Sequence, residues 1–293
     1  MLTFINSLNS REQAIGTWLF LFLAWVLIRK DTRASVFGVL KAFFHKKIIS
    51  VVVSMLIYTA LVVFAFAKIG VWYQFLIKET VFWIVGTALL LLMNTNKATQ
   101  NISFFKETVI NSLKLIVVLE FIVNFYTFSY WFELILVPAL VIIGGMNSLA
   151  EIKPEHKQAR KFINLLMASI GFLLIIYALD RAIINFQDFA TLQNFRTFAL
   201  PPLLTLAYIP FLYVFGLVMA YEMLFVRLGI FIKDENVLTF AKWKIFLLCN
   251  FNFRLLNSFV QNTGGEIIKL RSKHDVLSMI RNFKETRKMA GGK

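Results

Sequence analysis

The stretch IISVVVSMLIYTALVVFAFA, residues 48–67, runs for 20 residues without a charged side chain. A helix of about this length crosses the hydrocarbon of a bilayer, which needs about 20 mostly apolar residues. The stretch therefore predicts a membrane-spanning helix, and the rest of the chain is interpreted outward from it.

The composition agrees with a membrane protein. Hydrophobic residues make up 59% of the 293 positions and charged residues only 16%, against about 45–50% and about 25% in soluble domains. The chain has one cysteine, Cys249, and three widely separated histidines, so no internal disulfide and no metal or cofactor site is predicted. These facts exclude a soluble enzyme, a disordered chain and a disulfide-rich secreted fold. The predicted class is an all-α, polytopic transmembrane helix bundle.

The same criterion predicts seven spans. The third is the weakest, because its fully apolar part, Val81–Met93, is short and Lys78 and Glu79 must extend toward the headgroups. Residues 1–228 thus form the bundle, 229–289 form a basic helical tail, and 290–293 are interpreted as an appended sequence. The predicted spans are residues 12–28, 48–67, 77–93, 109–127, 129–149, 162–179 and 200–226.

The distribution of Lys and Arg predicts the orientation. With the N-terminus outside, the segments 29–47, 94–108, 150–161 and 227–293 lie inside and hold 25 of the 31 basic residues. The outer side holds five, when Lys78 at the outer end of the third span is counted with Arg11, Lys68, Arg181 and Arg196. Cytoplasmic segments collect Lys and Arg, so the N-terminus is expected outside and the C-terminus in the cytoplasm.

The tail contains a possible eighth span, Val237–Val260. Its basic residues and asparagines argue against insertion, so we expect helices at the inner interface or packed beneath the bundle. A last helix is expected from Ser272, with Asp275 three residues on as a capping partner. The apolar face predicted for that helix consists of Val276, Leu277, Met279, Ile280 and Phe283.

Carboxylates inside spans are the first candidates for function, because charge there is costly. Glu120 and Glu133 flank an external turn near 127–130 and lie at similar depth. In a symmetric oligomer they would form a cation-attracting ring. The alternative is structural: each accepts hydrogen bonds from a neighbouring helix, or Glu133 reaches the outer interface.

Other polar and helix-breaking residues give further candidates. Glu107, Asn111 and Lys114 share one face of the fourth span and either line an aqueous vestibule or serve packing. Pro210 is expected to kink the seventh span, either as a gating hinge or as a static bend. Pro201 and Pro202 are typical of a helix start.

The basic residues of the tail exceed what orientation requires, since short loops mostly set orientation. They are expected to hold anionic lipid headgroups, or to bind a cytoplasmic nucleotide or single-stranded nucleic acid with help from the aromatic side chains of Trp243, Phe246, Phe251 and Phe253. The candidate residues are Lys242, Lys244, Arg254, Lys269, Arg271 and Lys273.

In layout, the chain resembles transmembrane effectors of bacterial anti-phage systems. It is similar to the membrane subunit of Hailong-type systems, which pairs with a nucleotide polymerase. The resemblance rests on the multi-span bundle, the basic tail at Lys269–Lys288 and the lack of an enzymatic motif. It implies an oligomeric, ion-conducting effector controlled by an oligonucleotide.

Taken together, the sequence favours a non-enzymatic, oligomeric channel or pore-forming effector of antiviral defence, controlled from the cytoplasmic side. Its expected partners are the bilayer, further copies of itself, an anionic ligand and a partner protein of unknown identity. The alternatives are a small secondary transporter and a non-catalytic membrane scaffold. A lipid-modifying enzyme is less well supported, because the histidines lack a nearby carboxylate motif beyond Glu155.

Overall fold

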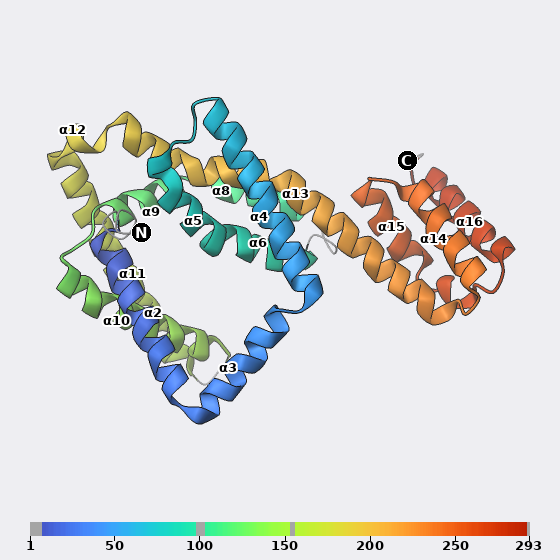
Figure 1. Cartoon of the computed structure of the whole chain (residues 1–293), viewed down its shortest axis with the longest axis horizontal. Coiled ribbons are helices and arrows are strands. Elements are labelled where there is room, and N and C mark those ends of the chain that lie inside the picture. Colours follow the sequence, from blue (N-terminus) through green and yellow to red (C-terminus); the bar gives the residue numbers. More distant parts are fainter. Residues whose placement is uncertain (1–7, 98–102, 153–155, 292–293) are drawn as a thin grey trace. The chain divides into compact units, whose positions relative to one another are not determined.

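A computed structural model describes residues 8–97, 103–152 and 156–291. Every regular element among them is a helix, which confirms the predicted all-α class (Figure 1). The chain divides into two compact units, which are described separately. Unit 1 comprises Met1–Phe82 and Ser112–Leu204, and unit 2 comprises Trp83–Asn111 and Thr205–Lys293.

Six helices in the described part of the chain are long and apolar enough to cross a membrane. A seventh is added if α8 (Ser103–Ser112) and α9 (Leu115–Phe125) form one broken span. The chain is therefore compatible with a multi-pass membrane protein with the predicted number of spans. The six are α2 (Ser10–Ile28), α4 (Lys46–Lys68), the run Gln74–Met93, α10 (Tyr130–Ile152), α11 (Lys157–Ile184) and α13 (Leu192–Phe231).

The run Gln74–Met93 is not a uniform helix. It consists of a 3₁₀ turn η1 (Gln74–Leu76), α5 (Ile77–Trp83), a π-helical segment η2 (Ile84–Ala88) and α6 (Leu89–Met93). At the start of the π segment, the Trp83 indole donates to Thr205 Oγ1 of α13 at 2.9 Å. The π segment therefore begins where this run is attached to α13.

In unit 1, α10 packs against both α2 and α11, and α11 also packs against α9 (Figure 1). The chain between the spans adds α3 (Lys30–Phe43) and the short α12 (Phe186–Phe189). The spans bury little of their apolar surface; α2 buries only Ala14 and Val26. Side chains that face lipid need no protein partner, because lipid tails are as apolar as they are.

Unit 2 ends in three helices that we call the C-terminal domain: α14 (Glu235–Cys249), α15 (Phe253–Thr263) and α16 (Lys273–Gly291), with a 3₁₀ turn η4 (Ile267–Lys269) before α16 (Figure 1). Their apolar faces form one hydrophobic core with the last turns of α13. The buried residues of α13 in this core are Leu217, Ala220, Tyr221, Leu224 and Leu228. Those from the C-terminal domain include Val237, Ala241, Ile245, Cys249, Phe253, Leu256, Phe259, Val276, Met279 and Phe283.

The helices of the C-terminal domain test the predictions for Val237–Val260 and for the last helix. Val237–Val260 is not one span: α14 ends at Cys249, and Asn250 turns the chain with a φ of 47°. The predicted cap of α16 is confirmed, because Ser272 and Asp275 each donate a backbone N–H to the other's side chain, at 2.8 and 3.2 Å. Leu277 departs from the predicted apolar face, since it is 45% exposed.

One boundary was predicted wrongly. Pro201 and Pro202 do not begin a helix, because α13 starts at Leu192 and runs for 40 residues. At 1.5 Å per residue this helix is roughly 60 Å long, about twice the hydrocarbon thickness of a bilayer. The predicted span 200–226 therefore marks only part of one long helix.

Candidate functional site

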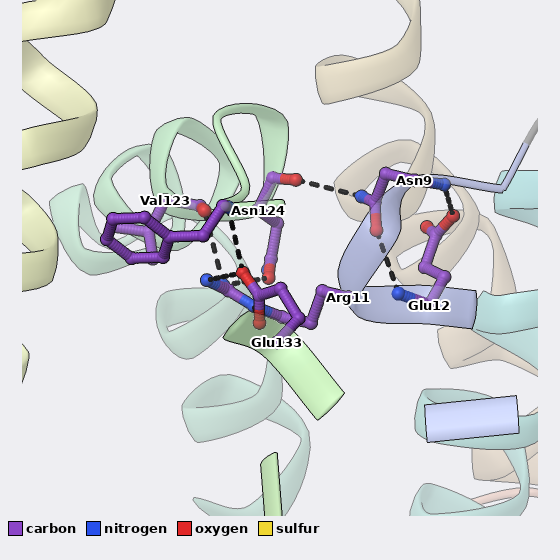
Figure 2. Close-up of polar contacts among 7 residues, drawn as sticks. Asn9, Arg11, Glu12, Val123, Asn124 and Glu133 are labelled. Atoms are coloured by element: carbon purple, nitrogen blue, oxygen red, sulfur yellow. Dashed lines mark hydrogen bonds and ion pairs between the residues drawn. The ribbon is translucent and has the colours of Figure 1, made fainter. Parts of the chain in front are cut away.

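An ion pair ties the start of α2 to α10 (Figure 2). The Arg11 guanidinium donates two parallel hydrogen bonds to the Glu133 carboxylate, Nε to Oε2 and Nη2 to Oε1, both at 3.0 Å. The Glu133 side chain is fully buried, and it accepts a third bond from the backbone N–H of Phe128 at 3.1 Å. Forked, charge-assisted bonds fix geometry as well as adding energy. They hold α2 and α10 in one register at this end.

The same guanidinium reaches the end of α9. Its Nη1 donates to the Val123 carbonyl and to Asn124 Oδ1, each at 3.2 Å. The side-chain amide of Asn9 donates to the Asn124 carbonyl at 2.9 Å. The last carbonyls of a helix have no partner within the helix, so Arg11 and Asn9 satisfy groups that the end of α9 leaves open.

The start of α2 presents these groups through its cap. Asn9 and Glu12 form a capping box, in which each side chain accepts the other residue's backbone N–H. Glu12 also accepts a hydrogen bond from Lys78 Nζ at 3.3 Å, and Lys78 lies 3.8 Å from a Glu79 oxygen. Lys78 therefore joins α5 to the same polar network.

A proline in α10 creates a second link to α2. Pro138 has no N–H, so the Leu134 carbonyl four residues earlier loses its helical donor. The Trp18 indole of α2 donates to that carbonyl at 2.8 Å. An unpaired carbonyl in the bilayer costs several kcal/mol. The Trp18 indole thus supplies the hydrogen bond that α10 cannot make by itself.

The two candidate carboxylates differ in their surroundings. Glu133 is buried and paired with Arg11, which matches the structural alternative of a carboxylate held by a neighbouring helix. Glu120 is exposed on α9 and remains the candidate for an ion path. Sequence reasoning missed the pair because Arg11 and Glu133 lie 122 residues apart. The available signal was the lone Arg in the first turn of α2, next to the expected outer boundary.

The predicted polar stripe in the fourth span is interrupted. Glu107 and Asn111 lie on one face of α8, but α8 ends at Ser112. Lys114 is the N-cap of α9 and has an extended backbone. The 3.6-residue period therefore stops before Lys114, and the prediction of one continuous face was wrong. All of Glu107, Asn111 and Lys114 are exposed.

The hinge candidate Pro210 lies within α13, which is helical from Leu192 to Phe231. Its ring takes the place of the N–H that would bond to the Leu206 carbonyl. A hinge at Pro210 stays a prediction.

The contacts between α13 and α14 follow an antiparallel order. Lys242 Nζ lies 5.7 Å from the centre of the Phe225 ring, and the rings of Phe246 and Tyr221 are 5.5 Å apart. Farther along, the Tyr221 hydroxyl donates to the Asn250 carbonyl at 2.7 Å. Later residues of α14 thus meet earlier residues of α13, and the α14–α15 turn returns toward the middle of α13.

The basic candidates of the tail have separate environments. Lys244 and Lys273 both lie over the Phe240 ring, at 5.5 and 5.6 Å from its centre, so their ammonium groups are within about 11 Å of each other. Arg271 donates to the Phe231 carbonyl at 3.1 Å and so satisfies the end of α13. Lys269 is exposed at the end of η4.

The aromatic candidates for stacking also divide. Trp243 and Phe251 are 60% and 65% exposed. Phe246 is half-buried against the core. Phe253 is fully buried between helices, so its predicted role as a stacking surface was wrong. Residues one turn apart on an amphipathic helix share a face, so their exposure can be predicted together. Phe253 begins a separate helix, α15, and the sequence did not predict the orientation of that helix.

The cap of α16 has an electrostatic consequence. The backbone N–H groups of Arg271 and Ser272 donate to the Asp275 carboxylate at 3.0 and 2.8 Å. These bonds favour the ionised form and hold the pKa of Asp275 below its usual value of 3.8. The cap therefore weakens when Asp275 is protonated as the pH falls.

Unit 1 also contains an apolar cavity of 520 Å³ between α9, α12 and the start of α13. The aromatic residues of its lining are Phe121, Phe189, Phe195 and Phe198. The lining is mainly apolar, with Thr191 and Asn194 as its polar members, so the cavity chiefly offers contacts to hydrocarbon.

No family model matches the chain, and neither a curated protein nor a solved structure is similar to it. Among the described residues, no group of three or more His, Cys, Asp or Glu side chains is placed to hold a metal ion. Functional inference therefore rests on two features: the polar network that joins α2, α9 and α10, and the core that joins α13 to the C-terminal domain.

Proposed function

We propose that the chain is an oligomeric channel or pore-forming effector of a bacterial inner membrane, controlled from the cytoplasmic side. One observation supports control above all: α13 is one unbroken helix, and its last turns share the hydrophobic core of the C-terminal domain. Packed cores switch between discrete arrangements and do not deform smoothly. A ligand that repositions the C-terminal domain would therefore move α13.

The proposed orientation places the N-terminus outside and the C-terminus in the cytoplasm. It is supported by the 25 basic residues in the segments assigned inside against five outside. Reporter fusions after Lys30, Lys161 and Lys293 should all report cytoplasm. A periplasmic signal from the fusion after Lys293 would contradict the orientation.

The proposed conduction path includes Glu120, which is exposed on α9, and excludes Glu133, whose charge is compensated by Arg11. In planar bilayers, Glu120→Gln should lower the preference for cations over anions while the oligomer still assembles. Glu151→Gln is the matched control, because Glu151 pairs with Arg160 in an exposed contact at 2.7 Å. Equal selectivity of both variants and wild type would remove Glu120 from the path.

Control by the C-terminal domain can be tested by locking it to α13. In a Cys249→Ala background, Phe225→Cys and Lys242→Cys, at two half-buried positions, place thiols where the Lys242 ammonium now lies 5.7 Å from the centre of the Phe225 ring. A short bis-maleimide should abolish the response of channel currents to added cell lysate. Each single-cysteine variant, treated alike, should keep the response. Unchanged gating after complete cross-linking would refute control through this core.

The proposed ligand is an anionic nucleotide or oligonucleotide, which fits the basic surface of the C-terminal domain and the resemblance to anti-phage effectors. Purified protein should bind such a ligand with a steep salt dependence, because counterions are released from the ligand. Lys244→Glu combined with Lys273→Glu should weaken binding, since both ammonium groups lie over Phe240. Lack of saturable binding to any tested nucleotide would remove the defence role.

A secondary transporter is the second candidate, and the break between α8 and α9 favours it. Transporters place substrate sites at discontinuous spanning helices, and here the chain leaves helical geometry at Lys114. If the wild-type protein gave no currents even with lysate present, a secondary transporter or a non-catalytic scaffold would be favoured over a channel.

A further inference from the structure

A hollow of 620 Å³ lies where the α14–α15 turn meets α13. Its lining residues are Tyr213, Asn250, Phe251, Asn252 and Arg254. They combine one cation, two amides and two aromatic rings, and no acidic side chain is among them. These side chains suit a ligand in which a phosphate group is attached to an apolar group.

The turn that forms the hollow is firmly held. The Tyr213 hydroxyl donates to the Phe251 carbonyl at 2.8 Å and accepts from the backbone N–H of Phe253 at 3.3 Å. The Tyr221 hydroxyl holds the preceding carbonyl, that of Asn250, at 2.7 Å. Two hydroxyls of α13 thus fix consecutive carbonyls of the turn, and the hollow keeps its shape as long as α13 and the C-terminal domain stay packed.

The length of α13 is compatible with a position of the hollow at the edge of the bilayer. From Leu217 to Leu228, one face of α13 is buried in the core of the C-terminal domain, so lipid cannot surround this part of the helix on all sides, although Val218 and Met223 on the other face are exposed. A spanning part of about 20 residues that starts at Leu192 ends near Tyr213. On this count, the turn that contacts Tyr213 is expected at the depth of the headgroups, on the same side as the C-terminal domain.

The side chains of the turn fit that depth. Phe251 is 65% exposed. In water this would leave a large apolar surface hydrated, whereas at the membrane interface the ring can enter the boundary between headgroups and acyl chains. Arg254 is exposed in the first turn of α15 and can donate to phosphate with forked geometry. Asn252 uses its Oδ1 to accept from the Leu255 N–H at 3.0 Å, which leaves its NH₂ group to donate.

We propose that the hollow between Tyr213 and the α14–α15 turn binds the phosphate of an anionic phospholipid headgroup. Arg254 and the Asn252 amide hold the phosphate, and Phe251 packs against the start of the acyl chain. The bound lipid fastens the C-terminal domain to the inner leaflet beside the end of the spanning part of α13. The choice of the inner leaflet rests on the proposed orientation, but the lipid site does not depend on conduction, so a failed channel test would leave it intact.

The test uses the full-length protein in a zwitterionic detergent. Phosphatidylglycerol, phosphatidylcholine, glycerol 3-phosphate and inorganic phosphate are titrated separately, and bound lipid is counted by native mass spectrometry. Wild type should bind phosphatidylglycerol saturably and phosphatidylcholine much more weakly. Arg254→Gln should weaken phosphatidylglycerol binding about tenfold, because a charge-assisted bond to phosphate is lost. The matched control Arg281→Gln, an exposed arginine of α16, should bind like wild type.

Retention of the fold is checked with Cys249, which is 1% exposed next to the turn and should resist maleimide in each variant. Phe251→Ser, which leaves all charges in place, should also weaken lipid binding and should not alter binding of the soluble phosphates. Equal binding by the Arg254 variant and wild type would overturn the proposal. So would binding of glycerol 3-phosphate or inorganic phosphate as tight as that of the lipid, because the occupant would then be a soluble anion.

Discussion

Two helix contacts in this chain are built on opposite principles. The contact of α2 with α10 buries few apolar side chains and is held by the Arg11–Glu133 pair and by the Trp18–Leu134 hydrogen bond. The contact of α13 with the C-terminal domain is a continuous apolar core whose members are nearly all under 8% exposed.

The difference reflects the solvent around each contact. Between spans there is no gain from moving apolar groups out of lipid, so packing and hydrogen bonds choose the partner. The C-terminal domain carries charged outer faces and must take its apolar surface out of water, which stabilises by about 25 cal/mol per Å². Polar substitutions should therefore damage the first contact, and cavity-forming substitutions the second.

The largest effect is expected from Phe259→Ala in the C-terminal domain. Phe259 is fully buried and meets the Phe283 ring edge-on at 5.1 Å. Its removal should lower the free energy of unfolding of the domain by about 3–5 kcal/mol. The rate at which a maleimide labels Cys249, the one cysteine of the chain, measures this opening. Leu277→Ala is the control, because Leu277 is 45% exposed and should change labelling little; similar labelling of both variants would contradict the core.

A smaller loss is expected from Glu133→Gln in unit 1. The Gln amide has one acceptor oxygen, so it can accept only one of the two parallel hydrogen bonds from the Arg11 guanidinium. It also leaves the Arg11 charge uncompensated, and the two losses together should cost about 1–3 kcal/mol. Thermal stability in detergent, followed by size-exclusion chromatography, measures it. Glu120→Gln serves as the control and should be neutral. Replacing the pair by Arg11→Met with Glu133→Leu should recover most of the loss, whereas a further loss would show that the charges have another use.

High pH should weaken the C-terminal domain. Burial raises the pKa of the Cys249 thiol from 9.0 to about 12, so the unfolded chain releases this proton first as the pH rises. The stability contributed by the neutral thiol is full below pH 9 and is lost toward pH 12, with about 1 kcal/mol gone at pH 10. Native-state proteolysis between pH 8 and pH 10 measures the change. Cys249→Ala should show a shallower pH dependence; an identical slope would assign the effect to other groups.

The smallest effect is expected at the proline of α10. Trp18→Phe removes the donor to the Leu134 carbonyl and should cost about 0.6 kcal/mol, the average for a hydrogen bond between spanning helices. In a Pro138→Ala background, the helix supplies its own donor, so the same change should cost less. A double-mutant cycle on thermal stability in detergent gives the coupling. A coupling of zero would mean that Trp18 does not serve the carbonyl freed by Pro138.

Several features followed from local sequence. Uninterrupted apolar runs such as residues 48–67 predict spans because each must be solvated by lipid along its whole length. The cap at Ser272 and Asp275 was predictable, since a capping box involves only residues three apart. The buried face of α16 was largely predictable from its helical period, with Leu277 as the exception at its edge.

The features that depend on contacts between residues far apart in the chain could not be predicted from local sequence. The sequence presents Glu120 and Glu133 as equals, and only the fold brings Arg11 to one of them across 122 positions. Whether Val237–Val260 forms a span also depended on tertiary structure, because the stretch is long enough to cross a bilayer. In the structure the chain turns at Asn250, and two tyrosines of α13 hydrogen-bond to the turn. Hydropathy determined which segments leave water, since it is a property of each side chain. Pairing of charges and sharing of a core were decided by the tertiary structure, because they require two segments to meet.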